Sequence, residues 1–238
     1  MLATIFRSGV VICLLAYITL TFIPKDLSLF LHMIKIKICG ITNTEDALNA
    51  VSLGVDAIGF IFAKTSKRYI SPEEAEAIAM FMPPFVSVVG VFVDSSKEEI
   101  DQITLRCRLD VIQLHGNETP QFCQSMSRRV IKAFHMAEPE DVEPIAAYQG
   151  VISGALLDTK VQNMSGGTGK VFDWGLALKA NSYEIPLVLA GGISVQNIKK
   201  AKELVNPYAV DLSSSVEEYP GKKDYNKMKA LVDAVRGL

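Results

Sequence analysis

Residues 34–42 are Ile34-Lys35-Ile36-Lys37-Ile38-Cys39-Gly40-Ile41-Thr42. They alternate apolar and polar side chains at period two, which predicts a β-strand with two different faces. The isoleucines before the glycine share one face, and the two lysines share the other with Cys39. Thr42-Asn43-Thr44-Glu45-Asp46 then has the cap candidates and first-turn acids of a helix start. The strand therefore carries a thiol to its carboxyl end, where ligand chemistry gathers in α/β proteins. A small buried Cys that only fills the strand is the plain alternative.

The totals exclude several classes of protein. A chain of 238 residues is the length of one large domain, and its net charge of -2 with 21% charged residues offers no basic field for nucleic acid. The four cysteines contain no CxxC pair, a pattern that favours a reduced cytoplasmic enzyme over a disulfide-bonded secreted fold. The histidines are scattered along the chain, so we expect no metal site. These residues are Cys13, Cys39, Cys107, Cys123, His32, His115 and His135.

The N-terminal 32 residues do not fit the rest of the sequence. Residues 9–23 are an uncharged, largely apolar run, shorter than the ~20 residues that cross a bilayer comfortably. Two interpretations compete: a leader or membrane anchor, or an over-extended reading frame with translation starting at Met33. We favour the second because Met33 directly precedes the first strand. We therefore treat 1–32 as an apolar extension, expect no membrane partner unless 9–23 is a real anchor, and take 33–238 as one catalytic domain.

Eight short apolar runs alternate with eight amphipathic stretches after residue 33. The predicted strands are Ile34–Ile41, Ala57–Ala63, Ser87–Val93, Val111–His115, Val130–His135, Ala155–Asp158, Pro186–Ala190 and Ala209–Ser213. The predicted helices are Thr44–Leu53, Ser71–Phe81, Lys97–Arg106, Pro120–Met126, Pro139–Tyr148, Phe172–Lys179, Val195–Leu204 and Tyr225–Val235. This alternation predicts a single-domain (β/α)8 TIM barrel. A doubly wound open sheet is the alternative, but it would place a glycine fingerprint after the first strand.

Polar side chains recur at the carboxyl ends of the predicted strands. Gln113 and His115 share one face at the end of the fourth strand, Asp158 closes the sixth, and Asp211 lies in the eighth. Each alone has a structural explanation, such as a loop cap or a pairing of Asp211 with Lys37 inside the barrel. Apolar filling would not place polar groups repeatedly at one edge, so we expect a site at this mouth of the barrel.

A phosphate site is predicted after the last two strands. Gly191 and Gly192 precede a predicted helix, and glycines followed by free helix amides suit an anion. Ser213 and Ser214 follow the eighth strand. In barrels of this type, phosphate commonly binds in the loops after strands seven and eight.

Six segments together resemble the phosphoribosylanthranilate isomerase family of tryptophan biosynthesis, over the range Met33 to Leu238. The resemblance rests on their order around the barrel. They are Lys37-Ile38-Cys39-Gly40-Ile41-Thr42, Ser66-Lys67-Arg68-Tyr69-Ile70, Gln113-Leu114-His115-Gly116, Leu156-Leu157-Asp158-Thr159, Gly166-Gly167-Thr168-Gly169-Lys170 and Pro220-Gly221-Lys222-Lys223-Asp224.

The resemblance implies an Amadori rearrangement of N-(5-phosphoribosyl)anthranilate that needs no cofactor. It makes Cys39 the general base and Asp158 the general acid, on opposite sides of a small phosphoribosyl substrate. It implies that Arg68 meets the anthranilate carboxylate, and that further substrate contacts come from Gln113, His115 and Asp211. It leaves the oligomeric state open.

One residue departs from the family pattern. The family usually has Gly where this chain has Ser215, in an Asp-x-Ser-Ser-Gly-Val-Glu run. If that position needs a positive φ, serine there costs about 1 kcal/mol and weakens phosphate binding.

Three other functions remain open. The histidine-pathway isomerase would have an Asp in place of Cys39, and indole-glycerol-phosphate synthase would need a catalytic Lys/Glu set that we do not find. The third is a catalytically silent barrel that binds phosphorylated ligands.

Overall fold

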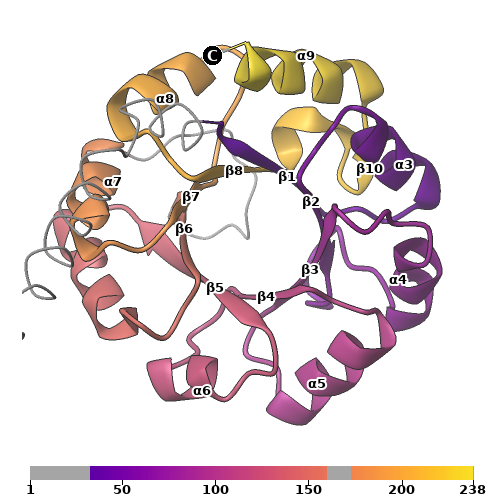
Figure 1. Cartoon of the computed structure of the whole chain (residues 1–238), viewed down its shortest axis with the longest axis horizontal. Coiled ribbons are helices and arrows are strands. Elements are labelled where there is room, and N and C mark those ends of the chain that lie inside the picture. Colours follow the sequence, from indigo (N-terminus) through magenta and orange to yellow (C-terminus); the bar gives the residue numbers. More distant parts are fainter. Residues whose placement is uncertain (1–32, 160–172, 238) are drawn as a thin grey trace, which may run out of the picture. The chain divides into compact units, whose positions relative to one another are not determined.

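The computed structural model describes residues 33–159 and 173–237, and within them the chain forms a closed barrel of eight parallel strands. The strands run in sequence order around the barrel, and the last pairs with the first (Figure 1). They are β1 (Lys35–Cys39), β2 (Ala57–Ile61), β3 (Ser87–Phe92), β4 (Val111–Leu114), β5 (Arg129–Met136), β6 (Gly154–Thr159), β7 (Leu187–Leu189) and β8 (Ala209–Leu212). The predicted (β/α)8 barrel is confirmed, and the open doubly wound sheet is wrong.

Helical segments follow the strands and surround the barrel (Figure 1). They are α3 (Thr44–Ser52), α4 (Pro72–Ala79), α5 (Lys97–Arg106), α6 (Pro120–Gln124), the 3-10 helix η1 (Pro139–Tyr148), α7 (Gly175–Ala180), α8 (Ile198–Val205) and α9 (Tyr225–Arg236). Two short 3-10 turns, η2 (Asn181–Tyr183) and η3 (Ser214–Val216), and a hairpin of β9 (Glu217–Tyr219) with β10 (Lys222–Lys223) complete the described elements.

Local sequence accounts for the best-predicted helices. Ser96 caps α5 by accepting a hydrogen bond from the amide of Glu99, and α5 has the predicted boundaries. Ser71 and Glu74 form a capping box at the start of α4, with Pro72 at the first helical position. These contacts satisfy amides that a helix start otherwise leaves without a partner.

Two expectations about these elements are corrected, and one element was not expected. Residues 139–148 form a 3-10 helix because Pro144, in its interior, has no N–H to donate. The helix expected from Val195 begins at Ile198, because the Asn197 side chain accepts from the amide of Ser194 and closes a turn there. The hairpin at 217–223 was not predicted, since strands of three and two residues are too short to show a period.

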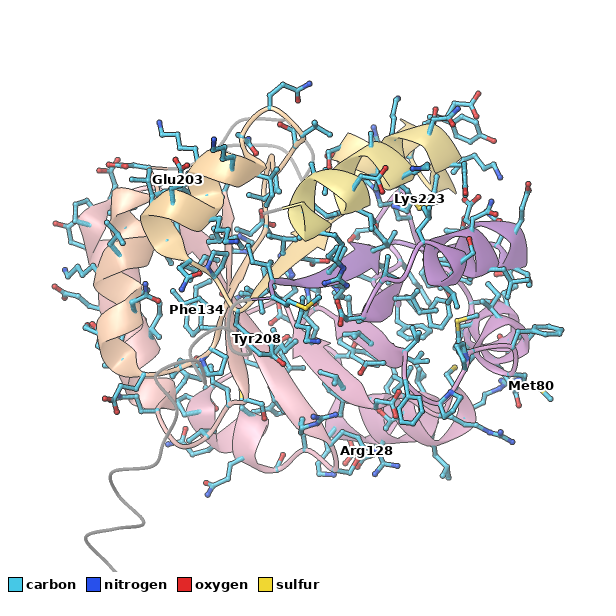
Figure 2. All side chains as sticks on the ribbon, turned by 45° about the horizontal axis from the view of Figure 1, so that its top comes forward. Met80, Arg128, Phe134, Glu203, Tyr208 and Lys223 are labelled. Carbon is cyan, nitrogen blue, oxygen red and sulfur yellow. The ribbon has the colours of Figure 1, made fainter. Side chains whose placement is uncertain are left out.

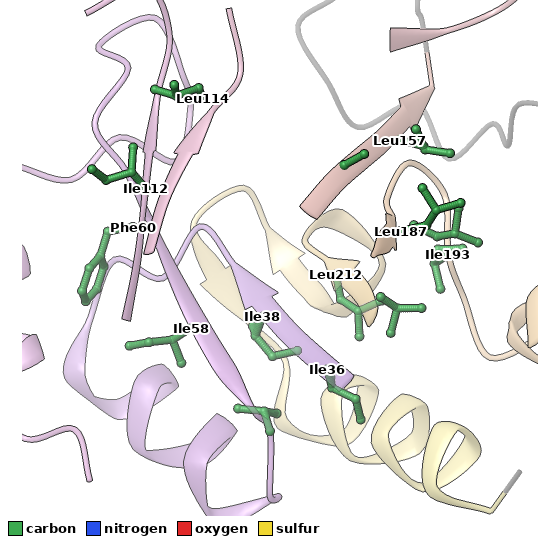
Figure 3. Close-up of a cluster of buried hydrophobic side chains, with 14 of the residues drawn as sticks. Ile36, Ile38, Ile58, Phe60, Ile112, Leu114, Leu157, Leu187, Ile193 and Leu212 are labelled. Atoms are coloured by element: carbon green, nitrogen blue, oxygen red, sulfur yellow. The ribbon is translucent and has the colours of Figure 1, made fainter. Parts of the chain in front are cut away.

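The alternating strand residues separate into an outer and an inner set. Ile36, Ile38 and Phe60 are buried between the strands and the surrounding helices (Figure 3). A smaller apolar cluster consists of Ala133, Leu156, Val188, Ala190 and Ala209. Burying each large side chain contributes roughly 1.5–3 kcal/mol, so the outer layer supplies most of the cohesion of the barrel.

Some sequence-based expectations fall outside the described residues. Those on the extension 1–32 and on the Gly166–Lys170 motif are among them. No helix in 33–159 or 173–237 is long and apolar enough to span a membrane.

We expect Ser71→Ala to lower the free energy of unfolding by about 1 kcal/mol, because it removes the cap of α4. In a domain of this size that lowers Tm by roughly 2–4 °C, which calorimetry can measure. Ser71→Asp is the matched control, because a carboxylate at this position also accepts the Glu74 amide. An unchanged Tm for Ser71→Ala would contradict this account of the helix start.

Candidate active site

The carboxyl ends of the strands bring the predicted polar residues to one mouth of the barrel. Cys39 is the last residue of β1, His115 directly follows β4, and Asp158 is the penultimate residue of β6. Asp211 lies in β8, the neighbour of β1. Because all eight strands are parallel, their ends face the same side.

Lys37 lies at the centre of the polar groups and is only 5% exposed. Its Nζ donates to Asp211 Oδ2 at 2.8 Å and to Gln113 Oε1 at 2.9 Å. Lys37 and Asp211 are register partners on β1 and β8, so closure of the barrel creates the pair. Burial alone would lower the pKa of Lys37, but the negative charge of Asp211 and the hydrogen bond to it outweigh burial and raise the pKa. Lys37 is therefore a cation inside the barrel.

Cys39 is buried on the same face of β1, two residues after Lys37. Its register partner Gly59 leaves room for it, because a Cβ at that position would lie 3.0 Å from both Cys39 Sγ and Lys37 Cε. Burial raises the pKa of the Cys39 thiol, the charge of Asp211 raises it further, and Lys37 opposes both. The net effect is a raised pKa, so Cys39 is a thiol at neutral pH. Among the groups that lower this pKa, Lys37 has the largest effect.

Arg68 lies in the loop after β2, and its side chain packs against Gly40, the residue that follows β1. A Cβ at Gly40 would lie 2.7 Å from Arg68 Cδ, and Gly40 has a φ of +75°, so glycine is required on both grounds. Arg68 Nε donates to Glu217 Oε1 at 2.8 Å and Nη2 donates to Glu217 Oε2 at 2.7 Å. This bidentate pair raises the pKa of Arg68 and fixes the plane of its guanidinium.

Lys223 connects this ion pair to the first strand. Its fully buried Nζ donates to Glu217 Oε1 at 2.8 Å and to the Cys39 carbonyl at 2.6 Å. Figure 2 shows Lys223 on the yellow C-terminal segment, which also carries α9. Burial lowers the pKa of Lys223, and Glu217 partly offsets that effect. The C-terminal segment thus holds both the backbone of Cys39 and the side chain of Arg68.

Asp158 lies within reach of two imidazoles. Its Oδ1 accepts from the Thr159 amide at 2.8 Å, and its Oδ2 lies 3.5 Å from His115 Nε2. His135 is the register partner of Asp158 on β5. One donor atom from each of His115, His135 and Asp158 lies within 4.8 Å of the others, a set of the kind that can hold a divalent cation. Sequence reasoning expected no such grouping, because these residues are far apart along the chain.

The predicted phosphate residues lie in two loops of unusual backbone shape. Gly191 and Gly192 have φ of +68° and +79°, and a Cβ at Gly191 would lie 2.6 Å from Asp158 Oδ1. The Asn197 side chain donates to the Gly192 carbonyl and accepts from the Ser194 amide, both at 2.8 Å. The glycine loop is therefore closed on itself beside Asp158.

The serine loop does not show the strain that its sequence suggested. Ser214 and Ser215 lie in the 3-10 turn η3, and Ser215 is not among the described residues other than glycine with a positive φ. The condition for a cost of serine, a positive φ, is therefore not met at this position, because the backbone of a 3-10 turn has a negative φ. Ser213 Oγ is buried with no hydrogen-bond partner among the described residues.

Comparison with known proteins places these observations in a family. Residues 36–234 match the family model for N-(5'phosphoribosyl)anthranilate (PRA) isomerase. The chain belongs to this family. The N-(5'-phosphoribosyl)anthranilate isomerase of Trichlorobacter lovleyi is 48% identical over 200 residues, which are 84% of this chain and 97% of that protein. The Geobacter sulfurreducens protein of the same name is 43% identical over 205 residues, 86% of this chain and 100% of its own.

Solved structures of isomerases in this family have the same barrel. The phosphoribosyl anthranilate isomerase of Thermotoga maritima superposes with a TM-score of 0.82 at 44% identity, over 87% of this chain and all of that chain. A second isomerase structure superposes with a TM-score of 0.78 at 42% identity and the same coverage of both chains. That structure is a complex with reduced 1-(o-carboxyphenylamino)-1-deoxyribulose 5-phosphate.

Sequence reasoning did not assign roles to Glu217, Lys223 and His135. For Lys223, the available signal was a lysine inside a motif that carries the family resemblance. For Glu217, the signal was an acid just before that motif. His135 ends a predicted strand, as the other polar residues do. Its place beside Asp158 follows only from the register between β5 and β6.

We expect the Cys39 thiolate of this isomerase to form only above the ordinary pH range of a free cysteine. Burial raises its pKa, so the protonated form persists to higher pH. The difference in thiolate ultraviolet absorbance between the native chain and Cys39→Ser measures this directly, because both proteins share the other cysteines. A Cys39 thiolate already present at neutral pH would contradict the prediction.

Proposed function

We propose that the residues at this mouth catalyse the rearrangement of N-(5-phospho-β-D-ribosyl)anthranilate to 1-(2-carboxyphenylamino)-1-deoxy-D-ribulose 5-phosphate. This aldose-ketose isomerisation is the third step of tryptophan biosynthesis from chorismate. The observation that carries the assignment of residues is the placement of a thiol and a carboxyl, Cys39 and Asp158, on β1 and β6 of one closed barrel. The reaction moves protons alone, so it calls for no cofactor.

In the first step, Asp158 in its acid form donates a proton to the furanose ring oxygen. The bond between that oxygen and C1 breaks, and the nitrogen lone pair forms a C1=N Schiff base. The amide of Thr159 and the imidazole of His115 lie against the two carboxyl oxygens and fix the orientation of the group. A well-placed proton donor of this kind contributes on the order of 10²–10⁴ in rate.

In the second step, the Cys39 thiolate takes the proton from C2. The C2–H electrons form a C1=C2 enolamine as the Schiff-base nitrogen becomes an amine, and tautomerisation then gives the ketone. Cys39 must first lose its own proton to water before the substrate binds, and its burial opposes this loss. Lys37 favours the thiolate because it holds a positive charge on the same face of β1.

We assign substrate contacts to the atoms that the protein leaves available. Arg68 uses Nε and Nη2 for Glu217, so Nη1 is the nitrogen for the anthranilate carboxylate. Asp211 Oδ1 is buried with no hydrogen-bond partner among the described residues, and it therefore suits a sugar hydroxyl. His115 faces the same space, while Gln113 lies behind it and is 1% exposed.

We assign the substrate phosphate to the loops after β7 and β8. The positive φ of Gly191 and Gly192 brings main chain close to this side of the mouth. The unpartnered hydroxyl of Ser213, together with Ser214, supplies side-chain donors from the second loop. Both loops belong to the positions where barrels of this kind hold phosphate.

The placement of the proton-transfer groups also bears on the alternatives. A silent phosphosugar-binding barrel would not need a thiol and a carboxyl at the ends of two strands of one mouth, and another isomerase of the fold would have an acid where Cys39 stands. We place this activity in the cytoplasm, because its cysteines are free in the described residues and its substrate is a small phosphorylated metabolite.

We expect Cys39→Ser and Asp158→Asn each to lower kcat at least ~10²-fold with little change in KM, because each removes a proton-transfer group. Steady-state kinetics on the anthranilate substrate measures both constants. Cys123→Ser is the matched control, because Cys123 is a buried thiol on α6, away from the strand ends. Near-native kcat in Cys39→Ser would show that another group is the base.

We expect Arg68→Ala to raise KM ~10-fold or more and to affect kcat less, because a carboxylate contact contributes mainly to substrate binding. Arg106→Ala is the matched control, since Arg106 pairs with Glu73 and Glu76 on the outer helices. Equal KM in the two variants would remove Arg68 from the substrate site.

A further inference from the structure

Five polar side chains lie in a row across the interior of the barrel, and hydrogen bonds join the first four. Asp211 accepts from Lys37 at 2.8 Å, and Lys37 donates to Gln113 Oε1 at 2.9 Å. Gln113 Nε2 then lies 3.1 Å from His115 Nδ1. His115 Nε2, on the other side of the ring, lies 3.5 Å from Asp158 Oδ2. This row of side chains connects the side of the mouth that holds Cys39 with the side that holds Asp158.

Lys37 fixes which way the Gln113 amide faces. An ammonium group has three donors and no acceptor, so the Gln113 atom beside it must be the oxygen. Asp211 holds Lys37 in place, and Lys37 and Gln113 are both buried. The amide NH₂ of Gln113 therefore faces His115.

The amide orientation in turn fixes the proton on His115. An NH₂ group can only donate, so the Nδ1 it meets at 3.1 Å must be an unprotonated acceptor. The neutral ring then carries its proton on Nε2, the nitrogen that faces Asp158. A proton on Nδ1 would point at the amide hydrogens and lose this hydrogen bond.

We propose that Lys37 and Gln113 are positioning residues that select the Nε2–H tautomer of His115, so that this imidazole donates to the Asp158 carboxyl and sets its orientation. The proposal rests on the role of Asp158 as general acid for its effect on the rate. The tautomer itself is independent of that role. Lys37 thereby serves both halves of the site, because the same ammonium also lies beside Cys39.

The tautomer also governs whether the cluster of His115, His135 and Asp158 can bind a metal. Their donor atoms are close enough for a divalent cation, but a protonated Nε2 has no lone pair to offer. The 3.5 Å between His115 Nε2 and Asp158 Oδ2 is near the separation of two ligands on a tetrahedral zinc ion. Gln113 therefore keeps this cluster a proton-transfer site and opposes metal binding there.

Gln113→Glu is the sharpest test, because it keeps the volume of the side chain and replaces its only donor with an acceptor. One carboxylate oxygen can still pair with Lys37, and the other then demands a proton on His115 Nδ1. We expect this variant to move the His115 proton to Nδ1, or to protonate both nitrogens. Gln149→Glu is the matched control, since Gln149 is exposed and donates to the Tyr183 carbonyl far from the site.

Nitrogen-15 NMR of the full chain, labelled at histidine, shows directly which ring nitrogen carries the proton. His135→Gln and His32→Gln identify the signals of the other two histidines, so that those of His115 can be followed. We expect Nε2–H for His115 in the native chain and in Gln149→Glu, and a protonated Nδ1 in Gln113→Glu. A native His115 with its proton on Nδ1 would overturn the proposal, whatever the activity of the enzyme.

Kinetics tests the positioning role. Imposing the wrong tautomer on a histidine that is itself the general base lowers kcat ~10⁴-fold. The effect should be smaller here, because His115 acts on the rate only through Asp158. We therefore expect Gln113→Glu to lower kcat at least ~10-fold with KM little changed. Native kcat in a variant whose tautomer has changed would overturn the positioning role and leave the assignment of Asp158 standing.

Zinc binding supplies a readout that does not depend on activity. We expect Gln113→Glu to bind Zn²⁺ alone at least ~10-fold more tightly than the native chain by calorimetry, because a carboxylate on Nδ1–H makes Nε2 a better ligand. Adding His135→Gln should remove that gain. Equal Zn²⁺ affinity of the native chain and Gln113→Glu would contradict the protonated Nε2 and overturn the proposal.

Discussion

The buried ion pair between Lys37 and Asp211 is the interaction on which the rest of the site depends. A lone ammonium inside a barrel would be strongly unfavourable, and removing one partner of a buried pair typically costs 3–5 kcal/mol. The pair exists because β8 closes against β1 in a register that sets these two residues side by side. Its cation then supports the Cys39 thiolate and fixes the Gln113 amide. Closure of the barrel therefore places the cation on which the polar groups of the mouth depend.

A second network holds the carboxyl end of β1. Glu217 accepts from both Arg68 and Lys223, and Lys223 also donates to the Cys39 carbonyl. These three charges are largely buried, and Glu217 pairs with both cations, so the C-terminal segment is tied to β1. The result is a guanidinium of fixed plane next to a thiol of fixed position. Both groups are therefore held in place by the fold itself.

The sequence was most informative where local physics decides the structure. Helix α5 has its predicted boundaries because Ser96 caps it, and the strands follow from alternation on two buried faces. The sequence was less informative in the loops. Asn197 closes a local turn that delays α8, and Ser215 lies in a 3-10 turn, where the positive φ that would penalise serine is absent. The β9–β10 hairpin is held by contacts such as Lys223 with Glu217, which no short sequence window contains.

By itself, the sequence determined the barrel and the identity of the polar groups at its mouth. Period-two strands and capped helices are local properties, and parallel strand ends must face one side. Only the tertiary structure decided the partners. It confirmed the pair of Lys37 with Asp211, which the sequence offered as one of several explanations, and it set Arg68 against Glu217 across 149 positions and His135 beside Asp158. The physical reason is that an electrostatic partner is set by distance in space, and strand register and barrel closure fix that distance only after folding.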